Sequence, residues 1–518
     1  MPMSGDALAT SVGPAWVDHS SKHVPGLFPL SVERVFNQVV AEHALAVTTV
    51  TAGARYYALH GLVAHEATTK GLEQETARDL LRRCEVAIAL ATLAHHDSEE
   101  HDWDRSVSPH AAERLRPLWR QGPINLPAIA QDGEGTYIQN KWGVLGSTYR
   151  GAEMTMKILE PAGLAPGPGY DDTAVRPALR DIFDLAALDH VSEETALEYG
   201  HLCLCRASTD TDSGWLRSIF TVPDAQPDTR GHRQAHTTRM LARAITHDRI
   251  HAPADVIPFL MAHPEAIDAG HGEAISRRWR GIAFRHESVN AWRQTWQALS
   301  DEVATRGVAT RQQMRDWFAD QATVGTVRSF TSALPTVVDD TGSPTLAERH
   351  EHVQGLDGVL PHIAVACLGA HRLSTLHEQE RLGFEGGPGT PTWALEEELS
   401  PRWVLRRIET WSDRPMADFM AALSDVLIDR AQRLSLQKAR FDRKRGQVVI
   451  PGRIHTRDDL VYRVYTEQAR PPALRLPQLM SMCHQVGLFD SPLSDPAGTA
   501  STTARPAWRL TEAGASLV

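Results

Sequence analysis

The chain has 518 residues, of which 42% are hydrophobic and 23% are charged. This composition excludes an intrinsically disordered chain, and the length predicts roughly three or four compact cores, since domains typically hold about 100 to 200 residues. The formal net charge of -11 excludes a surface that is basic throughout, so any contact with nucleic acid requires a local basic region.

The cysteines and the N-terminal segment indicate the cellular setting. Five cysteines are scattered along the chain, which differs from the dense, paired framework of a small secreted domain. The segment MPMSGDALATSVGPAW lacks the basic and apolar regions of a secretory signal, and no apolar run reaches the roughly 18 residues of a membrane span. We therefore expect a cytoplasmic protein without membrane contact.

Helical periodicity dominates the chain, with apolar residues at spacings of three and four. The stretches that we predict as helices are residues 31–47, 54–67, 74–96, 176–188, 192–205, 237–250, 288–307, 310–321, 361–382, 416–441, 457–469 and 476–489. In the stretch 288–307 the pattern predicts one apolar stripe, which we expect to form a buried core seam. The residues of this seam are Val289, Trp292, Trp296, Leu299 and Val303.

Glycine and proline clusters predict the limits between domains. They lie at residues 161–169 and at residues 383–392. We therefore expect an N-terminal helical domain over residues 1–160, a central helical domain over 170–382 and a basic C-terminal domain over 393–518. The predicted fold class is mainly α, a multi-domain helical protein with a C-terminal winged-helix-like (α+β) domain.

The C-terminal region changes character after the helix predicted at 416–441. Charged turn residues and Gly446 lead into Val448, Val449 and Ile450, which predicts a β-hairpin. A helix from Leu476 to Val486, a polar loop and the closing AWRLTEAGASLV resemble the recognition helix and wing of winged-helix domains. In that family the second helix of the helix-turn-helix enters the major groove of DNA.

A basic segment adjoins this region. Residues 430–457 hold nine arginines and lysines against one acid, Asp442, which gives a net charge of +8. Basic side chains that neutralise phosphates release counterions, so this segment predicts contact with nucleic acid. The residues that we predict at the interface are Arg433, Lys438, Arg440, Arg443, Lys444, Arg445, Arg453, Arg457, Gln478, Ser481 and His484.

Two short segments contain metal-binding residue types. In HHDSEEHDWD, residues 95–104, His96, Glu100 and His101 can share part of a helix face, but the spacing matches no known zinc motif. Cys203 and Cys205 in HLCLC, with His201 before them, form a second possible ligand set. No second cysteine pair lies nearby, and a structural zinc site normally needs four ligands. We interpret the first segment as a polar helix end and the cysteines as core thiols, so no metal site is predicted.

Motifs of nucleophilic and nucleotide-dependent enzymes are absent from the sequence. It contains no G-x-S-x-G elbow, no G-x-x-x-x-G-K-[ST] loop and no G-x-G-x-x-G between a strand and a helix. We therefore expect no cofactor and favour a protein that is not an enzyme. Neighbouring residues of a helix diverge by about 100°, so at most part of the group Arg55, Tyr56 and Tyr57 can share one surface. We expect a buried tyrosine and an arginine that caps a helix contact, rather than a surface that stacks on bases.

Several short motifs are spread along the chain. They are an N-terminal block with Leu27-Phe28-Pro29, Val47-Thr48-Thr49 and Arg55-Tyr56-Tyr57, a central helix with Trp292 and Trp296, and the winged-helix-like end. With these features the chain resembles a group of uncharacterised bacterial proteins that are often encoded in phage-defence islands. In that group the VTT element follows the proline block closely, whereas residues 31–45 separate the two here. The resemblance implies a defence-associated role with DNA-handling partners and assigns no catalytic residue.

Together these patterns predict a component of a bacterial antiviral-defence or DNA-maintenance system. It is expected to bind double-stranded DNA, or proteins of the same system, through its basic winged-helix-like region. One alternative is a metal-dependent hydrolase or nuclease that uses the cluster from His95 to Asp104. Another is a non-enzymatic scaffold for a helicase, nuclease or ATPase encoded nearby.

Overall fold

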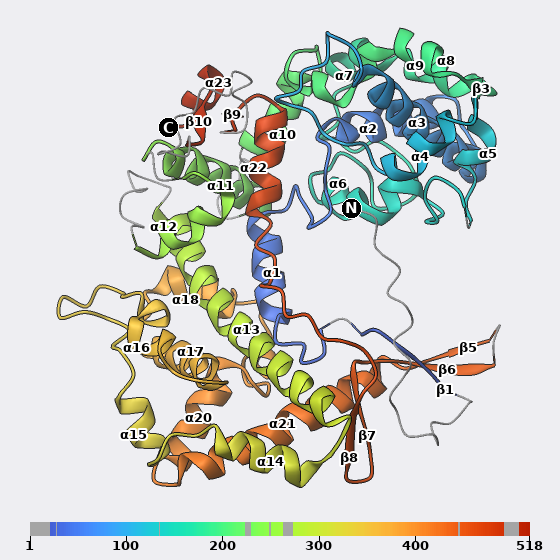
Figure 1. Ribbon diagram of the computed structural model, residues 1–518. Coiled ribbons are helices and arrows are strands. Elements are labelled where there is room, and N and C mark those ends of the chain that lie inside the picture. Colours follow the sequence, from blue (N-terminus) through green and yellow to red (C-terminus); the bar gives the residue numbers. More distant parts are fainter. Residues whose placement is uncertain are drawn as a thin grey trace. The chain divides into compact units, whose positions relative to one another are not determined.

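The computed structural model describes residues 21–26, 28–133, 135–222, 229–247, 250–262, 273–443, 446–491 and 507–518 (Figure 1). Helices hold 58% of the chain and strands 7%, which confirms the mainly α class. None of the helices in these described ranges is long and apolar enough to cross a membrane.

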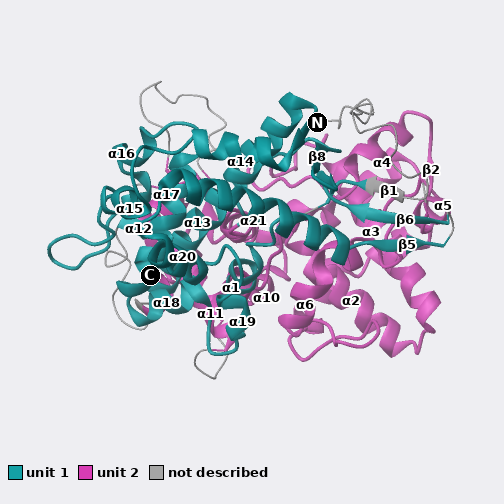
Figure 2. Cartoon of the chain, turned by 90° about the horizontal axis from the view of Figure 1, so that it is seen from below, with its two compact units in different colours: residues 1–39, 260–262, 277–473 teal, residues 40–259, 263–276, 474–518 magenta. Residues whose placement is uncertain are grey.

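The chain divides into two compact units that alternate along the sequence (Figure 2). Unit 1 consists of residues 1–39, 260–262 and 277–473, and unit 2 of residues 40–259, 263–276 and 474–518. The predicted limits near residues 160–170 and 383–392 fall inside unit 2 and unit 1, and the predicted C-terminal domain is shared between the units. The sequence gives no sign of these limits because three of them lie within helices: α1 (Arg34–His43), α12 (Val256–Ala262) and α13 (Glu273–Arg306).

Unit 2 is built mainly from short helices. Its α-helices are α2 (Arg55–Thr69), α3 (Gln74–His95), α4 (Ala112–Trp119), α5 (Leu126–Ala130), α6 (Arg150–Thr155), α7 (Asp172–Leu179), α8 (Ile182–Ala187), α9 (Glu193–Glu198), α10 (Ser213–Thr221), α11 (Arg230–Ile245), α22 (Leu476–Gln485) and α23 (Glu512–Ala515). The other helical turns are the π-helix η1 (Leu145–Tyr149) and the 3-10 turns η2 (Gly200–Leu202), η3 (Leu204–Ser208) and η4 (Pro253–Asp255). Two antiparallel strand pairs complete it: β2 (Ile124–Asn125) with β3 (His190–Val191), and β9 (Phe489–Asp490) with β10 (Arg509–Leu510).

Helix α3 is the centre of unit 2. It packs against α2, α5, α8 and α9, and from Val86 to His95 every side chain is buried. Alanines fill much of this stretch, so neighbouring helices can approach closely. Near its middle the guanidinium of Arg82, itself buried, donates hydrogen bonds to four carbonyl oxygens between residues 130 and 140. Helix α3 therefore fixes the loops around it as well as the helices.

A buried ion network joins α2, α3 and α6. His60 Nδ1 lies 2.6 Å from Glu153 Oε1, and His60 Nε2 lies 3.2 Å from Glu85 Oε1. Glu85 also accepts hydrogen bonds from the backbone N–H groups of Val144 and Leu145, where η1 begins. Burial alone lowers the pKa of His60, but the two carboxylates outweigh it and raise the pKa to about 9. His60 is therefore a buried cation that holds two buried carboxylates together.

Unit 1 contains most of α13, which has 34 residues, and two three-stranded sheets. Besides α1, α12 and α13 its α-helices are α14 (Arg311–Asp320), α15 (Val327–Ser332), α16 (Glu351–Gln354), α17 (Leu360–His371), α18 (Glu378–Glu385), α19 (Thr392–Leu395), α20 (Pro401–Trp411) and α21 (Met416–Gln437), with 3-10 turns η6 (Ala347–Arg349) and η7 (Arg372–Ser374). Its strands are β1 (Ser21–Val24), β4 (Val308–Thr310), β5 (Arg440–Asp442), β6 (Gln447–Pro451), β7 (Ile454–Arg457) and β8 (Leu460–Arg463). The sheet orders are β1-β6-β5, in which β1 runs parallel to β6, and β4-β8-β7, which is antiparallel.

The core of unit 1 forms where α14 packs along α21 and α17 along α20 (Figure 1). The predicted seam on α13 is confirmed, since Val289, Trp292, Trp296, Leu299 and Val303 are all buried. Helices α2, α3, α21 and α22 begin within one residue of their predicted starts, and the predicted hairpin forms from β5 and β6. Helix α13 begins at Glu273, well before the predicted start at residue 288, and α21 ends at Gln437, because Arg440 and Phe441 belong to β5.

The helix predicted over residues 457–469 is wrong. This segment starts with the end of β7 and continues through β8, whose Val461 pairs with Ala309 of β4 and with Thr456 of β7. The apolar residues of RDDLVYRVY satisfy helical spacing, but β-branched and aromatic side chains also favour a strand. The segment forms the strand β8 because it pairs with β4 on one side and with β7 on the other.

The buried ion network predicts a pH dependence of stability. Because the pKa of His60 is raised from 6.5 to about 9 in the folded state, its stabilising contribution is complete below pH 6.5 and is lost as the pH rises through 9. We expect the free energy of unfolding to fall over this range by up to about 3 kcal/mol. Urea-induced unfolding at pH 6, 7.5 and 9, followed by circular dichroism, measures the change. The double variant His60→Gln with Glu153→Gln should show a flatter profile, and equal slopes would contradict the assignment.

Candidate metal centre

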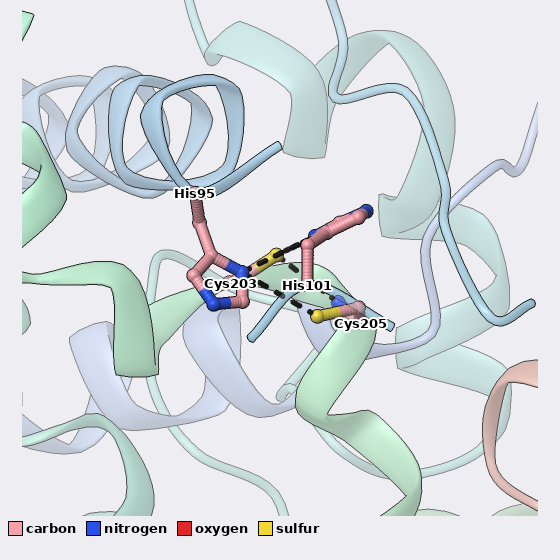
Figure 3. A group of neighbouring side chains, drawn as sticks. All are labelled: His95, His101, Cys203 and Cys205. Carbon is pink, nitrogen blue, oxygen red and sulfur yellow. Dashed lines mark hydrogen bonds between the residues drawn. The ribbon is translucent and has the colours of Figure 1, made fainter. Parts of the chain in front are cut away.

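Two segments far apart in the sequence bring four ligand-type side chains together. His95 is the last residue of α3, and His101 lies in the irregular segment that follows. Cys203 lies between η2 and η3, and Cys205 is the second residue of η3. In Figure 3 the four side chains converge, and the four ligand atoms all lie within 4.8 Å of one another.

The distances within this group match a tetrahedral ion. The two Nδ1 atoms of His95 and His101 are 3.2 Å apart, and the Nδ1–Sγ distances from His101 to Cys203 and from His95 to Cys205 are both 3.7 Å. An ion about 2.3 Å from each sulfur and about 2.05 Å from each nitrogen would place two nitrogens about 3.3 Å apart and a nitrogen and a sulfur about 3.6 Å apart. These three distances agree with those between the ligands of one tetrahedral ion, and the remaining distances lie within 4.8 Å.

The electrostatics of the group also suit a metal. Burial lowers the pKa of His95, and burial together with the neighbouring His96 and His95 lowers the pKa of His101 to about 4, so both imidazoles stay neutral. The interaction between the two thiols lowers the pKa of one, Cys205, below its ordinary value and raises that of the other, Cys203. Neutral imidazoles and a readily formed thiolate are the protonation states that bind zinc.

The Nε2 atoms of the two histidines, which are not the atoms that face the site, form no hydrogen bond within the described part of the chain. Nε2 of His95 and Nε2 of His101 are buried and form no hydrogen bond with any described residue. The two Nδ1 atoms lie 3.2 Å apart and can share a hydrogen bond if one of them carries a proton. If each Nε2 carries the proton instead, the two Nδ1 lone pairs face each other. A metal ion between them removes this repulsion, because it accepts both lone pairs.

The backbone of the cysteine segment is held from α2. The Arg55 Nη1 group donates to the carbonyl oxygens of His201 and Cys203, at 3.0 and 2.8 Å, while its other nitrogens pair with Asp210 and Asp212. The predictions of a buried tyrosine and of an internal contact of Arg55 are therefore confirmed, and both Tyr56 and Tyr57 are buried. The contact is with an irregular segment, where a helix was expected.

Helix α3 and Gly200 complete the support of the site. The hydroxyl of Thr92, one turn before His95, accepts a hydrogen bond from the backbone N–H of Leu204 at 3.2 Å. A Cβ atom at Gly200 would lie 2.9 Å from the His95 ring, so only glycine allows the segment to pass this close. The ring of His95 is thus fixed between its own helix and the cysteine segment.

The structure brings together the two segments that the sequence analysis considered separately as sources of metal ligands, residues 95–104 and 201–205. His101 lies in the group, but His96 and Glu100 do not, because α3 ends at His95 and no helix face continues beyond it. His96 Nδ1 contacts Arg116, and Glu100 is exposed and pairs with Arg206. Cys203 and Cys205 are buried, as expected of core thiols, but they face two histidines from a segment about 100 residues earlier. Their interpretation as ordinary core residues was therefore incomplete.

The predicted nucleic-acid contacts fall in both units. In unit 1, Arg433, Lys438, Arg440, Arg443 and Arg457 are exposed and Arg453 is half-buried, whereas Lys444 and Arg445 lie outside the described residues. Arg433 pairs with Glu398, Lys438 Nζ donates to the carbonyl oxygen of Phe28, and Arg453 contacts Glu467.

In unit 2, the predicted contacts lie on α22. Gln478 is half-buried, Ser481 is exposed and His484 is buried. The two ring nitrogens of His484 lie 2.9 Å from the carbonyl oxygen of Phe489 and 2.6 Å from that of Asp104. Most other side chains of α22 are buried within unit 2. The predicted recognition helix therefore offers few side chains for contact with bases.

Comparisons of the chain with protein-family models, with curated proteins and with solved structures gave no match. The interpretation of the site therefore depends on the geometry of the four side chains.

The contact between Arg55 and the cysteine segment predicts an effect on metal affinity. Lysine keeps the positive charge of Arg55 but cannot donate to two carbonyl oxygens and two carboxylates at once. We expect Arg55→Lys to lower the affinity for zinc about 10- to 100-fold, as is typical when a group that orients a ligand is lost. Competition with a chromophoric chelator measures the affinity. The matched change Arg83→Lys, at a surface ion pair on α3, should leave it unchanged; an equal affinity in both variants would contradict the role of Arg55.

Proposed function

We propose that this chain is a zinc-binding protein in which the metal has a structural role in unit 2. The observation that carries the proposal is the tetrahedron of His95, His101, Cys203 and Cys205. Two nitrogens and two sulfurs at tetrahedral spacing favour zinc, because calcium, magnesium and manganese prefer oxygen ligands.

Two features favour a structural metal over a catalytic one. Protein side chains fill all four positions of the tetrahedron, whereas catalytic zinc sites keep one position open for water or substrate. All four side chains are also buried, with at most 6% of their surface exposed. The hydrolase or nuclease considered from the cluster between His95 and Asp104 would need such an open position.

The metal would join two parts of unit 2 that contain little regular secondary structure. Residues 200–208 form 3-10 turns, and residues 96–110 form no α-helix or strand. Short turns supply little stability of their own, so a metal that links them to the end of α3 contributes its binding energy to folding. We propose that unit 2 depends on zinc for its stability.

Metal analysis tests this proposal. The protein purified without chelator should contain one zinc per chain by mass spectrometry, and Cys203→Ser and His101→Ala should each lose it. Removal of zinc should also lower the melting temperature by several degrees, because a single bound ion stabilises the folded state by its binding energy.

Two matched variants serve as controls. His96→Ala changes a histidine next to the site, and Cys84→Ser changes a buried cysteine of α3 outside it. Both should retain one zinc per chain. Wild-type protein that holds no zinc after reconstitution, or a melting temperature that a strong chelator leaves unchanged, would overturn the proposal.

A second proposed function is contact with nucleic acid through unit 1, and a specific observation favours it. The hairpin of β5 and β6, which we call the basic ribbon, presents Arg440, Phe441 and Arg443 to solvent, with Phe441 61% exposed. Phe441 shares a face of the ribbon with the exposed Val448, its partner across the hairpin. Arginines beside an exposed aromatic ring combine contact with phosphates and stacking on bases.

This second function agrees with the resemblance to proteins of phage-defence islands. We propose on that basis that the chain serves bacterial antiviral defence or DNA maintenance, with nucleic acid bound at the basic ribbon. Two other predictions stay predictions. One is that α22 acts as the recognition helix of a winged-helix-like domain, and the other is that the chain is a scaffold for a helicase, nuclease or ATPase encoded nearby.

Salt dependence tests the role of the basic ribbon. A titration of a fluorescent DNA duplex with protein, at several salt concentrations, gives the slope of log affinity against log salt. Replacing Arg440 and Arg443 by glutamine should lower this slope by about 2, one for each lost phosphate contact.

The control removes the same charge elsewhere in unit 1. Arg328→Gln with Arg407→Gln changes two exposed arginines of α15 and α20 and should leave the slope as it is in the wild type. Equal slopes for both double variants, or no DNA binding by the wild type, would contradict a role of the basic ribbon.

A further inference from the structure

Arg285 of α13 is a buried cation without an anionic partner among the residues that the structure describes. It is 6% exposed, and its guanidinium lies over Phe384, 5.7 Å from the ring centroid. It forms no hydrogen bond or ion pair within the described ranges. A buried charge without a partner costs free energy, and burial lowers the pKa of Arg285 to about 10. An anion beside the guanidinium would offset this cost.

A small pocket gives the guanidinium of Arg285 access to solvent. The pocket has a volume of about 10 Å³ and is partly open, and it is lined by Arg285, by the start of α1 and by the residues before α20. Arg285 Nε is enclosed by protein, whereas Nη1 and Nη2 keep accessible surface, so these two nitrogens face the pocket. This volume is about the smallest that admits one water-sized particle. The pocket therefore suits a single small ion or a water molecule.

The carboxylates near the pocket are already paired with other arginines. Glu397 Oε1 lies 2.9 Å from Arg430 Nη2. Glu385 Oε2 accepts a hydrogen bond from Arg402 Nη2 at 2.9 Å. These two carboxylates attract Arg285 from a distance, but neither forms an ion pair with it. Together with its ion-pair network the pocket has six arginines against four glutamates, which are Arg34, Arg285, Arg402, Arg406, Arg430 and Arg433 against Glu385, Glu396, Glu397 and Glu398.

Two helices begin at the pocket and add to its positive potential. Ser400 lines the pocket and is the N-cap of α20, where its Oγ accepts a hydrogen bond from the backbone N–H of Trp403. Val32, Arg34 and Val35 line the pocket at the start of α1. The N-terminus of a helix carries a partial positive charge, because its first backbone N–H groups have no acceptor within the helix. Both helix starts therefore favour an anion next to Arg285.

We propose that this pocket binds a chloride ion, which Nη1 and Nη2 of Arg285 hold. The ion would supply the negative charge that the buried guanidinium lacks, and it would join the middle of α13 to the starts of α1 and α20. A monoatomic anion fits because the pocket has no room for a phosphate or a carboxylate group. The site lies entirely in unit 1, so it depends neither on the zinc proposed for unit 2 nor on the basic ribbon.

Melting temperatures in chloride test the proposal. The wild type is titrated with sodium chloride in exchange for sodium gluconate, so that the ionic strength stays constant. Its melting temperature should rise by about 2 °C or more and level off as the site saturates. Arg285→Met keeps a long side chain over Phe384 but removes the charge, so its melting temperature should respond to chloride much less.

The matched control removes an arginine that is exposed. Arg328→Gln changes an arginine of α15 that pairs with Asp413 at the surface, and it should respond to chloride as the wild type does. If chloride raises the melting temperature of the wild type no more than that of Arg285→Met, the pocket holds only water and the proposal is overturned.

The line width of chlorine NMR measures binding in the wild type, without a variant that has to fold. Chloride that exchanges with a protein site gives a broadened line, and bromide should narrow it again by competing for the same site. A line that bromide leaves unchanged overturns the proposal. Arg285→Met should lose the broadening and Arg328→Gln should keep it. Broadening that Cys203→Ser removes and Arg285→Met retains would place the chloride at the metal and would also overturn the proposal, although the zinc site would stand.

Discussion

Four side chains that bind one ion must lie within a few ångströms of one another, although Cys203 follows His101 by 102 residues and Cys205 follows His95 by 110. Several features of unit 2 satisfy this requirement. Helix α3 is buried along its last three turns and therefore fixes the position of His95. Arg55 of α2 holds the backbone of the cysteine segment at His201 and Cys203. The ion network around His60 joins α2 to α3. The histidine at the end of α3 and the cysteine segment held by α2 are therefore positioned by the same pair of helices.

This arrangement gives the Arg55-Tyr56-Tyr57 motif a physical role. Arg55 neutralises the buried Asp212 and at the same time donates to two carbonyl oxygens beside the cysteines. The two tyrosines are packed in the core, where Tyr149 lies between them and bonds to Gly53 through its hydroxyl group. The motif therefore stabilises the start of α2 and the cysteine segment together. Loss of the arginine would leave a buried carboxylate without its partner as well as a loosened metal site.

Much of the fold follows from periodicity in the sequence, but the site does not. The seam on α13 is predictable because Trp292 and Trp296 are spaced by four residues and must face one core. The limits of the units are not predictable, because they fall inside α1, α12 and α13 without any change in composition. The candidate metal site was not predicted, because its four residues come as two pairs, His-x₅-His and Cys-x-Cys, and neither pair fits a known motif. The sequence does contain a pattern that could have suggested the site, which is a histidine at the end of an apolar helix together with a Cys-x-Cys pair elsewhere in the chain.

X-ray absorption at the zinc edge tests the central claim most directly, because it reports the ligands around the metal in the intact protein. A tetrahedral site of His95, His101, Cys203 and Cys205 predicts two sulfurs at about 2.3 Å and two nitrogens at about 2.0 to 2.1 Å. Replacing Cys205 by serine should reduce the sulfur shell to one or abolish the signal. A shell of oxygen and nitrogen alone, or one that includes bound water in place of a cysteine, would contradict the closed site and with it the structural role of the metal.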